Sequence, residues 1–432
     1  MAQAEGELLV AAGDVTSSSA VVWVRGVRAG EVIVDVAPAG TEGAGRRLML
    51  AVLGEDDLTG KARVDQLTPS TRYRYRVAQH GASSEGEFVT APASADPTPV
   101  RFLWSGDLGG AGLCRPAEGG FGIFPTMLRH PADFFLFVGD TVYTDVPCDK
   151  PGAAPGGNYR ATTLAQYRGR HRHNRQDAGY QALLRRMSVY AIWDDHEVRN
   201  DFAGTTEPRM PVGRQAFLEY WPIVPPAEEP GRLYRRVRWG RLLELFILDT
   251  RQYRSDNSTP DGPGKTMLGP AQRRWLIDGV TSSTATWKVV VSSVTLSVST
   301  GRPERRDGWS SANIFGLPQD GAGFATERDA ILREFRTRDV RNIVFVAADV
   351  HHAELIRHHP HHSWSFHEFI AGPLSASVGR PRPLDFSLSP RSLFARGGVF
   401  NFGEVTVEPT HLTVRLIDDT GAVMFTHTVG PE

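Results

Sequence analysis

Aspartate and histidine residues gather in a few short stretches of this sequence, each placed directly after an apolar run. The densest is IWDDHEVRND (192–201), and the others are SGDLGG (105–110), GDTVYTD (139–145) and AADVHH (347–352). Carboxylates and imidazoles are side chains that bind metal ions in proteins. The pattern therefore suggests a metal site, although a charge run is more often a solvated loop.

Aspartates also end five of the six long apolar runs in the second part of the chain. These runs are RFLWSGD, DFFLFVGD, SVYAIWDD, LLELFILDT and NIVFVAAD, and the sixth is WKVVVSS. Ligand sites in α/β sheets lie beyond the carboxyl ends of the strands, so adjacent strands would bring these aspartates to one crevice. A single aspartate there is usually a helix cap or turn former. Several of them, accompanied by histidines, favour a metal site.

Two more residues fit such a site. Tyr143 follows Asp140 by three positions, and a phenolate ligand favours a ferric ion over a divalent one. His351 follows Asp349 by two positions, so both point the same way if the strand continues. The glycines after Asp107 would let the backbone approach a ligand closely. Taken alone, Tyr143 is more often a residue packed under a loop, and a lone histidine is more often a core or surface residue.

The elements that must position these residues fall into two regions. Alternating runs between residues 8 and 90, such as AVVWVRG, EVIVDVA and RYRYRVAQ, predict an immunoglobulin-like or fibronectin-like β-sandwich over residues 1–92. Proline and alanine break the pattern before residue 100, so we expect a linker at 93–99. From 100 to 432, buried-looking strands alternate with helical segments such as GPAQRRWLIDGV. This region predicts an α/β layered domain.

Composition narrows the classes of function. Lysine and arginine number 48 against 49 acidic residues, and a net charge of -1 gives no electrostatic footprint for nucleic acid or an anionic membrane. Any anion must therefore be bound locally. No apolar run approaches the roughly 20 residues that span a bilayer. The first residues, MAQAEGELLV, lack the features of a signal peptide, although AQA resembles the remnant of a cleaved one. The oligomeric state is left open.

Cys114 and Cys148 are too few for a disulfide framework and lack the spacing of a thiolate zinc site. Each follows one of the strand-end motifs by a few residues, so both could lie near the mouth of the crevice. Two interpretations stay open. They pair as a disulfide, which would indicate export, or they are two unpaired thiols in loops.

The blocks FLWSGD, DFFLFVGDTVYTD, WDDHEVRND, LDTRQYRS, MLGPAQRRWLIDGV and ADVHH occur in an order that resembles the calcineurin-like metallophosphatases, and within them the PhoD-like alkaline phosphatase family. The resemblance extends over nearly the whole chain. It implies an α/β fold in which helices flank a β-sandwich (αββα), preceded by the small all-β domain. It also implies an exported, periplasmic or cell-surface phosphatase, while the absence of a visible signal peptide leaves a cytoplasmic location open.

The resemblance further implies a dinuclear or larger metal centre. Its oxygen-rich ligation suits a ferric ion beside Ca²⁺ or Mn²⁺ better than Zn²⁺. The implied ligands are Asp107, Tyr143 and His351 for the first ion, Asp140 as a bridge, Asp195 and Asp349 for the second ion, and Asn200 or Asp194 as a supplement.

Two positions depart from the family pattern. Many members carry a cysteine where this chain has Asp107, so its DLG triplet is closer to the first motif of purple acid phosphatases and thiolate ligation is not expected. The histidine that follows the strand before the last motif in related enzymes is absent, and Ser292 and Ser293 stand there instead. The second departure weakens the ligand set of the second ion.

The expected reaction is hydrolysis of a phosphomonoester or diester by a hydroxide that bridges the metal ions. His196 would stabilise the developing charge or protonate the leaving oxygen. Arg251 is a candidate phosphate clamp, because guanidinium binds phosphate bidentately, and pairing with Asp249 or a surface acid is its alternative role. Arg199 and Asp201 are expected to be solvated charges.

Two other functions are consistent with these motifs. A phosphodiesterase or phospholipase D would use the same residues on a substrate with a second ester arm. A non-catalytic, metal-dependent binding protein would keep the ligands without turnover. Comparing a monoester with a diester, and testing for any hydrolysis at all, distinguishes the three functions.

Overall fold

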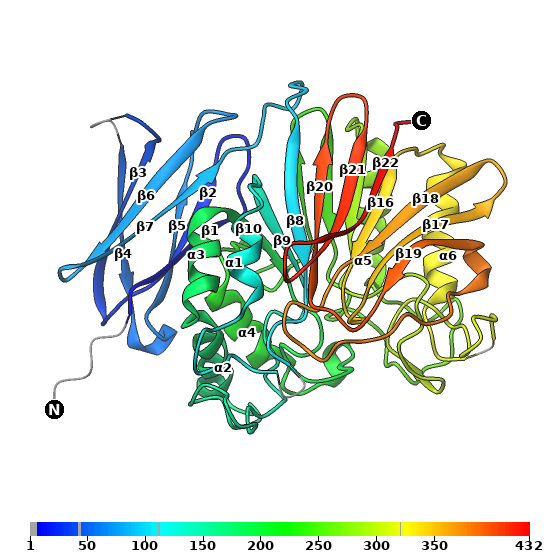
Figure 1. The fold of residues 1–432 in the computed structure, drawn as a ribbon, viewed down its shortest axis with the longest axis horizontal. Helices are drawn as coiled ribbons and strands as arrows, with labels where there is room; N and C mark the ends of the chain where they lie inside the picture. The colour runs from blue at the N-terminus through cyan, green and yellow to red at the C-terminus, as the bar shows by residue number, and fades with distance from the viewer. Residues whose placement is uncertain (1–6, 42–44, 111–112, 320) are drawn as a thin grey trace.

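The computed structural model describes residues 7–41, 45–110, 113–319 and 321–432. The AQA tripeptide at residues 2–4 lies outside the described residues. The described part of the chain folds into three large β-sheets flanked by helices (Figure 1). None of its helices is long and apolar enough to cross a membrane.

The N-terminal strands form a β-sandwich, as their alternation predicts. One sheet contains β1 (Leu9–Gly13), β2 (Ala20–Arg25) and β5 (Thr59–Val64), and the other has the order β4 (Arg46–Val52), β3 (Gly30–Pro38), β6 (Arg72–Gln79) and β7 (Ala82–Val89). In β6, Tyr73, Tyr75 and Val77 are buried, whereas the arginines between them are exposed. This is the period-two burial of a sheet with one face in a core.

The N-terminal strands are connected to the rest of the molecule by strand pairing as well as by the chain. β1 pairs in parallel with β10 (Ser188–Ile192), with Gly13 opposite Val189. A Cβ at Gly13 would lie 2.3 Å from the carbonyl oxygen of Val189, so the pairing needs glycine here. Residues 93–99 contain no strand or helix, and we propose them as the boundary between domains at 1–92 and 100–432.

Two large sheets contain the strands of the second region, and the first of them continues into the N-terminal strands β1, β2 and β5. The first is nine-stranded, with the order β22-β21-β20-β8-β9-β10-β1-β2-β5, and the second is seven-stranded, with the order β11-β12-β13-β16-β18-β17-β19. The strands not yet bounded are β8 (Val100–Ser105), β9 (Phe134–Val138), β11 (Arg235–Trp239), β12 (Leu243–Ile247), β13 (Trp287–Val291), β16 (Ile343–Ala347), β17 (Ala353–His361), β18 (Trp364–Ile370), β19 (Pro390–Arg396), β20 (Asn401–Val407), β21 (Leu412–Asp418) and β22 (Val423–Val429). The short strands β14 (Gly301–Arg302) and β15 (Arg305–Arg306) form a separate hairpin.

Helices cover the outer faces of these sheets. They are α1 (Ile123–Met127), α2 (Leu164–Arg175), α3 (Ala178–Arg186), α4 (Met210–Tyr220), α5 (Gly269–Ser282) and α6 (Ala325–Thr337), with 3₁₀ turns η1 (Gly54–Asp56), η2 (Gly204–Thr206) and η3 (Phe386–Leu388). In β16, Val344 and Val346 belong to the core shared with the other sheet, whereas Ile343 and Phe345 belong to the core under α5 and α6. Such strands are buried on both faces, which is why they read as continuous apolar runs.

Candidate metal centre

The carboxyl ends of the central strands converge, as the sequence predicts. β8, β9 and β10 run parallel in one sheet, and β12, β13 and β16 run parallel in the other. Beyond these ends lies a hollow of about 380 Å³, here called the acidic hollow. Its lining includes Asp140, Asp195, Asp201, Asp307, Asp349, His196, His351, Asn200, Thr300, Gly301, Val378 and Arg382.

The backbone at this hollow is strained. Asp107, Asp140, Asp201, Asp349 and His351 all have a positive φ, between 47° and 68°. This left-handed region is unusual for residues other than glycine and costs free energy, so it persists only where the surrounding structure enforces it. Such residues cluster at functional sites, which supports a function for the hollow.

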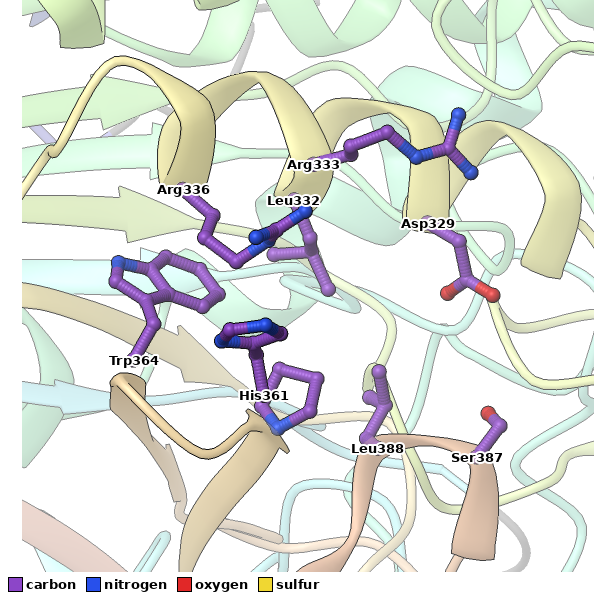
Figure 2. A pocket seen from close by; sticks show the side chains of 9 residues that line it. Asp329, Leu332, Arg333, Arg336, His361, Trp364, Ser387 and Leu388 are labelled. Atoms are coloured by element: carbon purple, nitrogen blue, oxygen red, sulfur yellow. The ribbon is translucent and has the colours of Figure 1, made fainter.

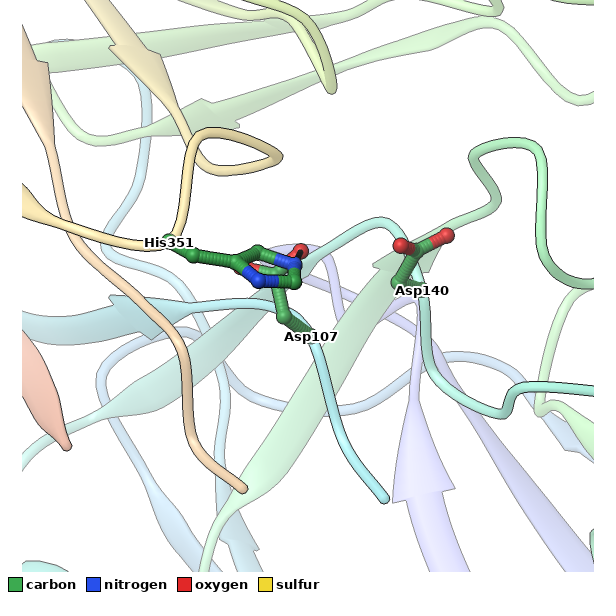
Figure 3. A group of neighbouring side chains, drawn as sticks. All are labelled: Asp107, Asp140 and His351. Atoms are coloured by element: carbon green, nitrogen blue, oxygen red, sulfur yellow. Dashed lines mark ion pairs between the residues drawn. The ribbon is translucent and has the colours of Figure 1, made fainter. Parts of the chain in front are cut away.

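Asp107, Asp140 and His351 form the first group of possible ligands, and Figure 3 shows the imidazole beside the carboxylate of Asp107. Their ligand atoms all lie within 4.8 Å of one another. His351 Nε2 is 3.6 Å from Asp107 Oδ1 and 2.9 Å from the phenolic oxygen of Tyr143. The structure thus brings together all four residues that the sequence assigns to the first ion and the bridge.

The charge balance of this group fits a cation. Both carboxylate oxygens of Asp107 are buried without a hydrogen-bond partner among the described residues. Burial and then the neighbouring Asp194 raise the pKa of Asp107 well above its usual range, and burial and then Asp195 do the same to the pKa of Asp140. A buried carboxylate without a partner is costly, and a metal ion held among these oxygens would remove the cost.

Asp140 also belongs to a second group, with Asp195 and His196. One carboxylate shared between two groups has the placement of a bridging ligand. Asp349 lines the same hollow, and its Oδ2 atom is buried without a hydrogen-bond partner in the part of the chain that the structure describes. Burial, followed by the nearby aspartates, raises its pKa well above the usual range. Asp195 thus belongs to the second group, whereas Asp349 shares with it the lining of the hollow.

His196 is hydrogen-bonded to Asp145, which was not predicted from the sequence as a functional residue. Its Nδ1 atom lies 2.6 Å from Asp145 Oδ1, and Asp145 also accepts a hydrogen bond from the backbone N–H of Asn200. Burial opposes a charge on His196, but the carboxylates of Asp195 and Asp145 outweigh it and raise its pKa to about 9. Asp145 is part of the GDTVYTD stretch, so its position two residues after Tyr143 was the available signal.

Arg251 does not line the acidic hollow, so the structure does not place it as a phosphate clamp. Its guanidinium is completely buried and donates to both oxygens of Asp194, at 2.7 and 2.9 Å, and to both oxygens of Asp307, at 2.6 Å each. The N–H groups of the guanidinium therefore all donate to acceptors within the protein. The acids that pair with it are neither Asp249 nor a surface residue, because Asp249 instead accepts from Trp193 Nε1.

Asp194, one of the two supplementary ligands suggested by the sequence, is occupied in the same way. Besides Arg251, it accepts a hydrogen bond from the Ser293 hydroxyl at 2.5 Å. It faces neither the hollow nor the solvent, whereas Asn200, the other suggestion, is exposed and lines the hollow. Ser292 and Ser293, which were expected to stand in place of a histidine ligand, do not line the hollow: Ser293 donates to Asp194, and Ser292 donates to the carbonyl oxygen of Val294.

Asp201 and Asp307 are further acids at the hollow. Asp201 is half-buried rather than solvated, and burial together with Asp307 and Asp195 raises its pKa to about 6. Asp307 lies close enough to Asp195 and Asp201 to form a third acidic group. However, Asp307 also receives hydrogen bonds from Arg251, Arg254 and Asn257, so its charge is already balanced. We therefore assign no ion to this group.

The two loops that carry Asp107 and Tyr143 support each other. A Cβ at Gly110 would lie 2.4 Å from the ring of Tyr143, so this glycine makes room for the phenol rather than for a ligand. Cys114 and Cys148, which follow the two loops, form a disulfide. Arg170 in α2 donates to the carbonyl oxygen of Tyr143 at 2.8 Å. These contacts fix the position of the phenolic oxygen relative to Asp107.

A smaller hollow of about 210 Å³ lies between α6 and the β17–β18 hairpin (Figure 2). Arg336, His361 and Trp364 line it, and Asp329 is the only acid among the described residues around it. It offers no group of converging carboxylates. The acidic hollow is therefore the better candidate for metal binding.

Comparisons with known proteins agree with this site. Residues 104–415 match the family described as PhoD-like phosphatase, and residues 2–92 match its N-terminal domain. Alkaline phosphatase D of Bacillus subtilis (strain 168) is 26% identical over 386 residues, which cover 79% of this chain and 64% of that protein. The matched part of the chain thus spans less than two thirds of that relative's length.

Two solved structures share the fold. The structure of PhoD superposes with a TM-score of 0.80 and 22% identity, over 98% of this chain and 92% of the other. A purple acid phosphatase from yellow lupin (Lupinus luteus) seeds superposes with a TM-score of 0.68 and 14% identity, over 98% and 74% of the two chains. These matches confirm the predicted fold class of two sheets flanked by helices behind an all-β N-terminal region.

Proposed function

The chain belongs to the PhoD-like phosphatase family, and on that premise we propose that it is a metal-dependent phosphoric ester hydrolase of the alkaline phosphatase type. The observation that carries the proposal is the group of buried carboxylates at the strand ends. There the oxygens of Asp107 have no hydrogen-bond partner among the described residues, and Asp140 lies within ligand distance of both Asp107 and Asp195. This arrangement suits two neighbouring cations. The proposed ligands are Asp107, Asp140, Tyr143 and His351 for the first ion, and Asp140, Asp195 and Asp349 for the second, with Asn200 at the rim.

The donor set favours hard cations. Apart from His351, every proposed ligand atom is an oxygen, and the phenolic oxygen of Tyr143 favours a ferric ion in the first position. Carboxylates suit Ca²⁺ or Mn²⁺ in the second position. When bound, such ions polarise the phosphoryl oxygens and acidify a water molecule.

The protein's own contribution to proton transfer lies in His196. Asp145 accepts from Nδ1, which orients the imidazole and leaves Nε2 free of that contact, and His196 lines the hollow. The neighbouring carboxylates favour the protonated ring. His196 can therefore donate a proton to the leaving oxygen of the ester or stabilise its developing charge.

The substrate is proposed to be a phosphomonoester or a phosphodiester. A hollow of about 380 Å³ is in the size range of small-molecule sites, so it leaves room beside the phosphate for an ester arm. This room also suits the alternative of a phosphodiesterase or phospholipase D. Arg382 lines the hollow, is exposed and lacks an ion-pair partner among the described residues. It replaces Arg251 as the candidate for holding the phosphate.

An extracellular, periplasmic or cell-surface location is proposed as well. Its support is the Cys114–Cys148 disulfide, because disulfides form and persist in oxidising compartments. The intact mass of the protein isolated from its cells, with and without reductant, tests the pairing. Two free thiols would contradict it.

Elemental analysis combined with turnover tests the proposed function. We expect at least two metal ions per chain and hydrolysis of p-nitrophenyl phosphate or its bis-ester that chelator abolishes and the same metals restore. Iron in the first position should give a visible tyrosinate band that Tyr143→Phe removes. Tight phosphate binding without hydrolysis of either ester, under any metal loading, would instead favour a binding protein.

The role of His196 has its own test. His196→Ala should lower kcat by about 10²–10⁴-fold while the metal content stays near that of the wild type, because the ring moves a proton and is not a proposed ligand. Asp145→Asn, which keeps the side-chain shape, should lower kcat less and move the alkaline limb of the pH profile to lower pH. The shift follows because removing a carboxylate lowers the pKa of His196. Unchanged turnover in His196→Ala would contradict the role.

A further inference from the structure

Four large apolar side chains next to the acidic hollow are left in solvent. Ile314, Phe315, Leu317 and Phe386 are exposed by 70%, 68%, 52% and 55% of their surfaces. Single exposed apolar residues are ordinary, but a contiguous group on a soluble surface usually marks an interaction site. Val378, another exposed apolar residue, lines the acidic hollow, whereas Met49 and Val423 lie on β4 and β22.

The four side chains form one surface because their two segments touch. The backbone N–H of Phe386 donates to the carbonyl oxygen of Gly316 at 2.9 Å. A Cβ at Gly316 would lie 2.2 Å from the carbonyl oxygen of Leu384 and 3.3 Å from the Phe386 ring. The backbone of the loop therefore packs against η3. We call the surface of Ile314, Phe315, Leu317 and Phe386 the apolar rim.

The loop of the apolar rim is well supported although its side chains are exposed. Asn313 Oδ1 accepts hydrogen bonds from the N–H groups of Phe315 at 2.9 Å and Leu317 at 3.1 Å. The Asn313 N–H donates to the carbonyl oxygen of Leu317 at 2.9 Å. These bonds satisfy the backbone and hold the apolar side chains outward, so their exposure belongs to the folded loop.

Both segments of the apolar rim, the loop of residues 314–317 and η3, lie next to the mouth of the acidic hollow. Ala312, two residues before Ile314, accepts a hydrogen bond from the Ser299 hydroxyl at 3.0 Å, and Ser299 directly precedes Thr300 of the hollow. On the other segment, Arg382 lines the hollow four residues before Phe386 and donates to the carbonyl oxygen of Ser299. A partner on the apolar rim would therefore lie beside the opening.

Four exposed arginines lie on the segments next to the apolar rim, since Arg306 of the β14–β15 hairpin donates to the carbonyl oxygen of Ala312 at 2.7 Å. Arg302 and Arg305 project from the β14–β15 hairpin, and Arg380 and Arg382 precede η3. None of the four forms an ion pair with a described residue. Glu304 is the one acid on the hairpin. Asp256 is a further nearby acid, since the hydrogen bonds from Ser258 and the charge of Arg305 lower its pKa. The four arginines outnumber these two acids, so the charge on these segments is positive.

We propose that the apolar rim, with Arg302, Arg305 and Arg380 beside it, docks on an anionic lipid surface, so that Arg382 and the acidic hollow face that surface. Aromatic and aliphatic side chains flanked by cations are the composition of interfacial membrane contacts, in which apolar burial and attraction to anionic lipids add. A second copy of the chain fits less well, because a two-fold contact through this surface would bring the arginines of both copies together. The inference goes beyond the proposed hydrolysis, since docking is measured without turnover.

Vesicle binding by the metal-loaded full-length protein tests the proposal. We expect sedimentation with vesicles of phosphatidylglycerol and phosphatidylcholine, little sedimentation with phosphatidylcholine alone, and weaker binding at high salt. Phe315→Ser with Leu317→Ser should lower the partition coefficient on the order of tenfold or more. Arg302→Ser with Arg305→Ser should weaken binding and reduce its dependence on salt. Met49→Ser with Val423→Ser, a matched pair of exposed apolar residues elsewhere, should bind like the wild type.

Further measurements separate docking from folding and from catalysis. Turnover of soluble p-nitrophenyl phosphate and the thermal unfolding temperature should be unchanged in the apolar-rim variants. If the double variant is unfolded, Ile314→Ser, which changes the most exposed of the four side chains, takes its place. Failure of the wild type to bind anionic vesicles, equal loss of binding in the control pair, or a wild-type dimer that the apolar-rim variants convert to monomers would each overturn the proposal. Loss of hydrolysis with vesicle binding retained would contradict only the proposed function.

Discussion

The buried aspartates in and beside the acidic hollow form two groups. Both contain the same residue type at the same burial, but their charge balances are opposite. Asp107 and Asp140 are 1% and 2% exposed, and their pKa values are raised by burial and by nearby carboxylates. The oxygens of Asp107 have no hydrogen-bond partner within the described ranges of the chain. Asp194 and Asp307 are 1% and 2% exposed, but the guanidinium of Arg251 lies between them. We call these the unpaired half and the paired half.

The difference shows that burial alone does not identify a metal ligand. Burial would raise the pKa of Asp307, but the charges of Arg251 and Arg254 lower it to about 2. The paired half therefore has its counterions within the chain, whereas the unpaired half has room for cations supplied from outside. Removing one acid from each half should have opposite consequences for activity and for stability.

Asp140→Asn in the unpaired half should have the largest effect. It removes the carboxylate shared by both ligand groups, so we expect kcat to fall by on the order of a thousandfold or more and the metal content to decrease. In chelator, the variant should be at least as stable as the wild type, because one repelling carboxylate is gone. Kinetics, elemental analysis and urea unfolding measure these three properties. Turnover within tenfold of the wild type would contradict a bridging role.

Asp307→Asn in the paired half should act mainly on stability. It leaves Arg251 and Arg254 without one of their buried counterions, and breaking a buried ion pair costs about 3–5 kcal/mol. The cost should be the same with and without chelator, since it does not depend on a metal. Asp140→Asn in chelator is the matched control. A variant of normal stability that has lost metal would instead make Asp307 a ligand.

Much of the fold follows from local sequence patterns. Strands buried on both faces appear as short continuous apolar runs, and strands buried on one face alternate, so both kinds were predicted near their observed positions. The pairing of β1 with β10 was not predicted, because it depends on a single contact between Gly13 and Val189 that leaves no local pattern. Long-range pairing of this kind needs the three-dimensional structure.

The same limit applies to the site. Asp195 and His196 were found because they follow directly after an apolar run. The partners of Arg251 were not, because 57 residues separate it from Asp194 and 56 from Asp307. Asp201 was assigned to solvent because charge runs usually are solvated, but the hollow half-buries it. A sequence shows which residue types are near a strand end, while the charge balance between them depends on the packing of two sheets.

The pH dependence of stability should also differ between the two halves. This effect is expected to be smaller than those of Asp140→Asn and Asp307→Asn. Burial raises the pKa of Glu197, beside the unpaired half, from 4.5 to about 7, even though Thr141 and the N–H of Asp194 donate to it. A group with a raised pKa in the folded state binds its proton more tightly there than in the unfolded chain. Its contribution is therefore fully present below about pH 4.5 and is lost as the pH rises through 7. Between pH 8 and pH 6, Glu197 alone should add about 1.4 kcal/mol to the stability of the metal-free protein.

Asp307 in the paired half has the opposite sign. Because its folded pKa is lowered to about 2 from 3.8, its contribution is present above pH 3.8 and is lost only as the pH falls towards 2. Measured by urea unfolding in chelator, Glu197 should thus raise the stability of the metal-free protein from pH 8 to pH 6, against histidines such as His171 and His367, whose pKa values burial lowers to about 3, and Asp307 should lower the stability below pH 4. Glu197→Gln should flatten the first change and leave the second. A Glu197→Gln variant whose stability changes between pH 8 and pH 6 as that of the wild type does would show that Glu197 does not take up its proton on folding.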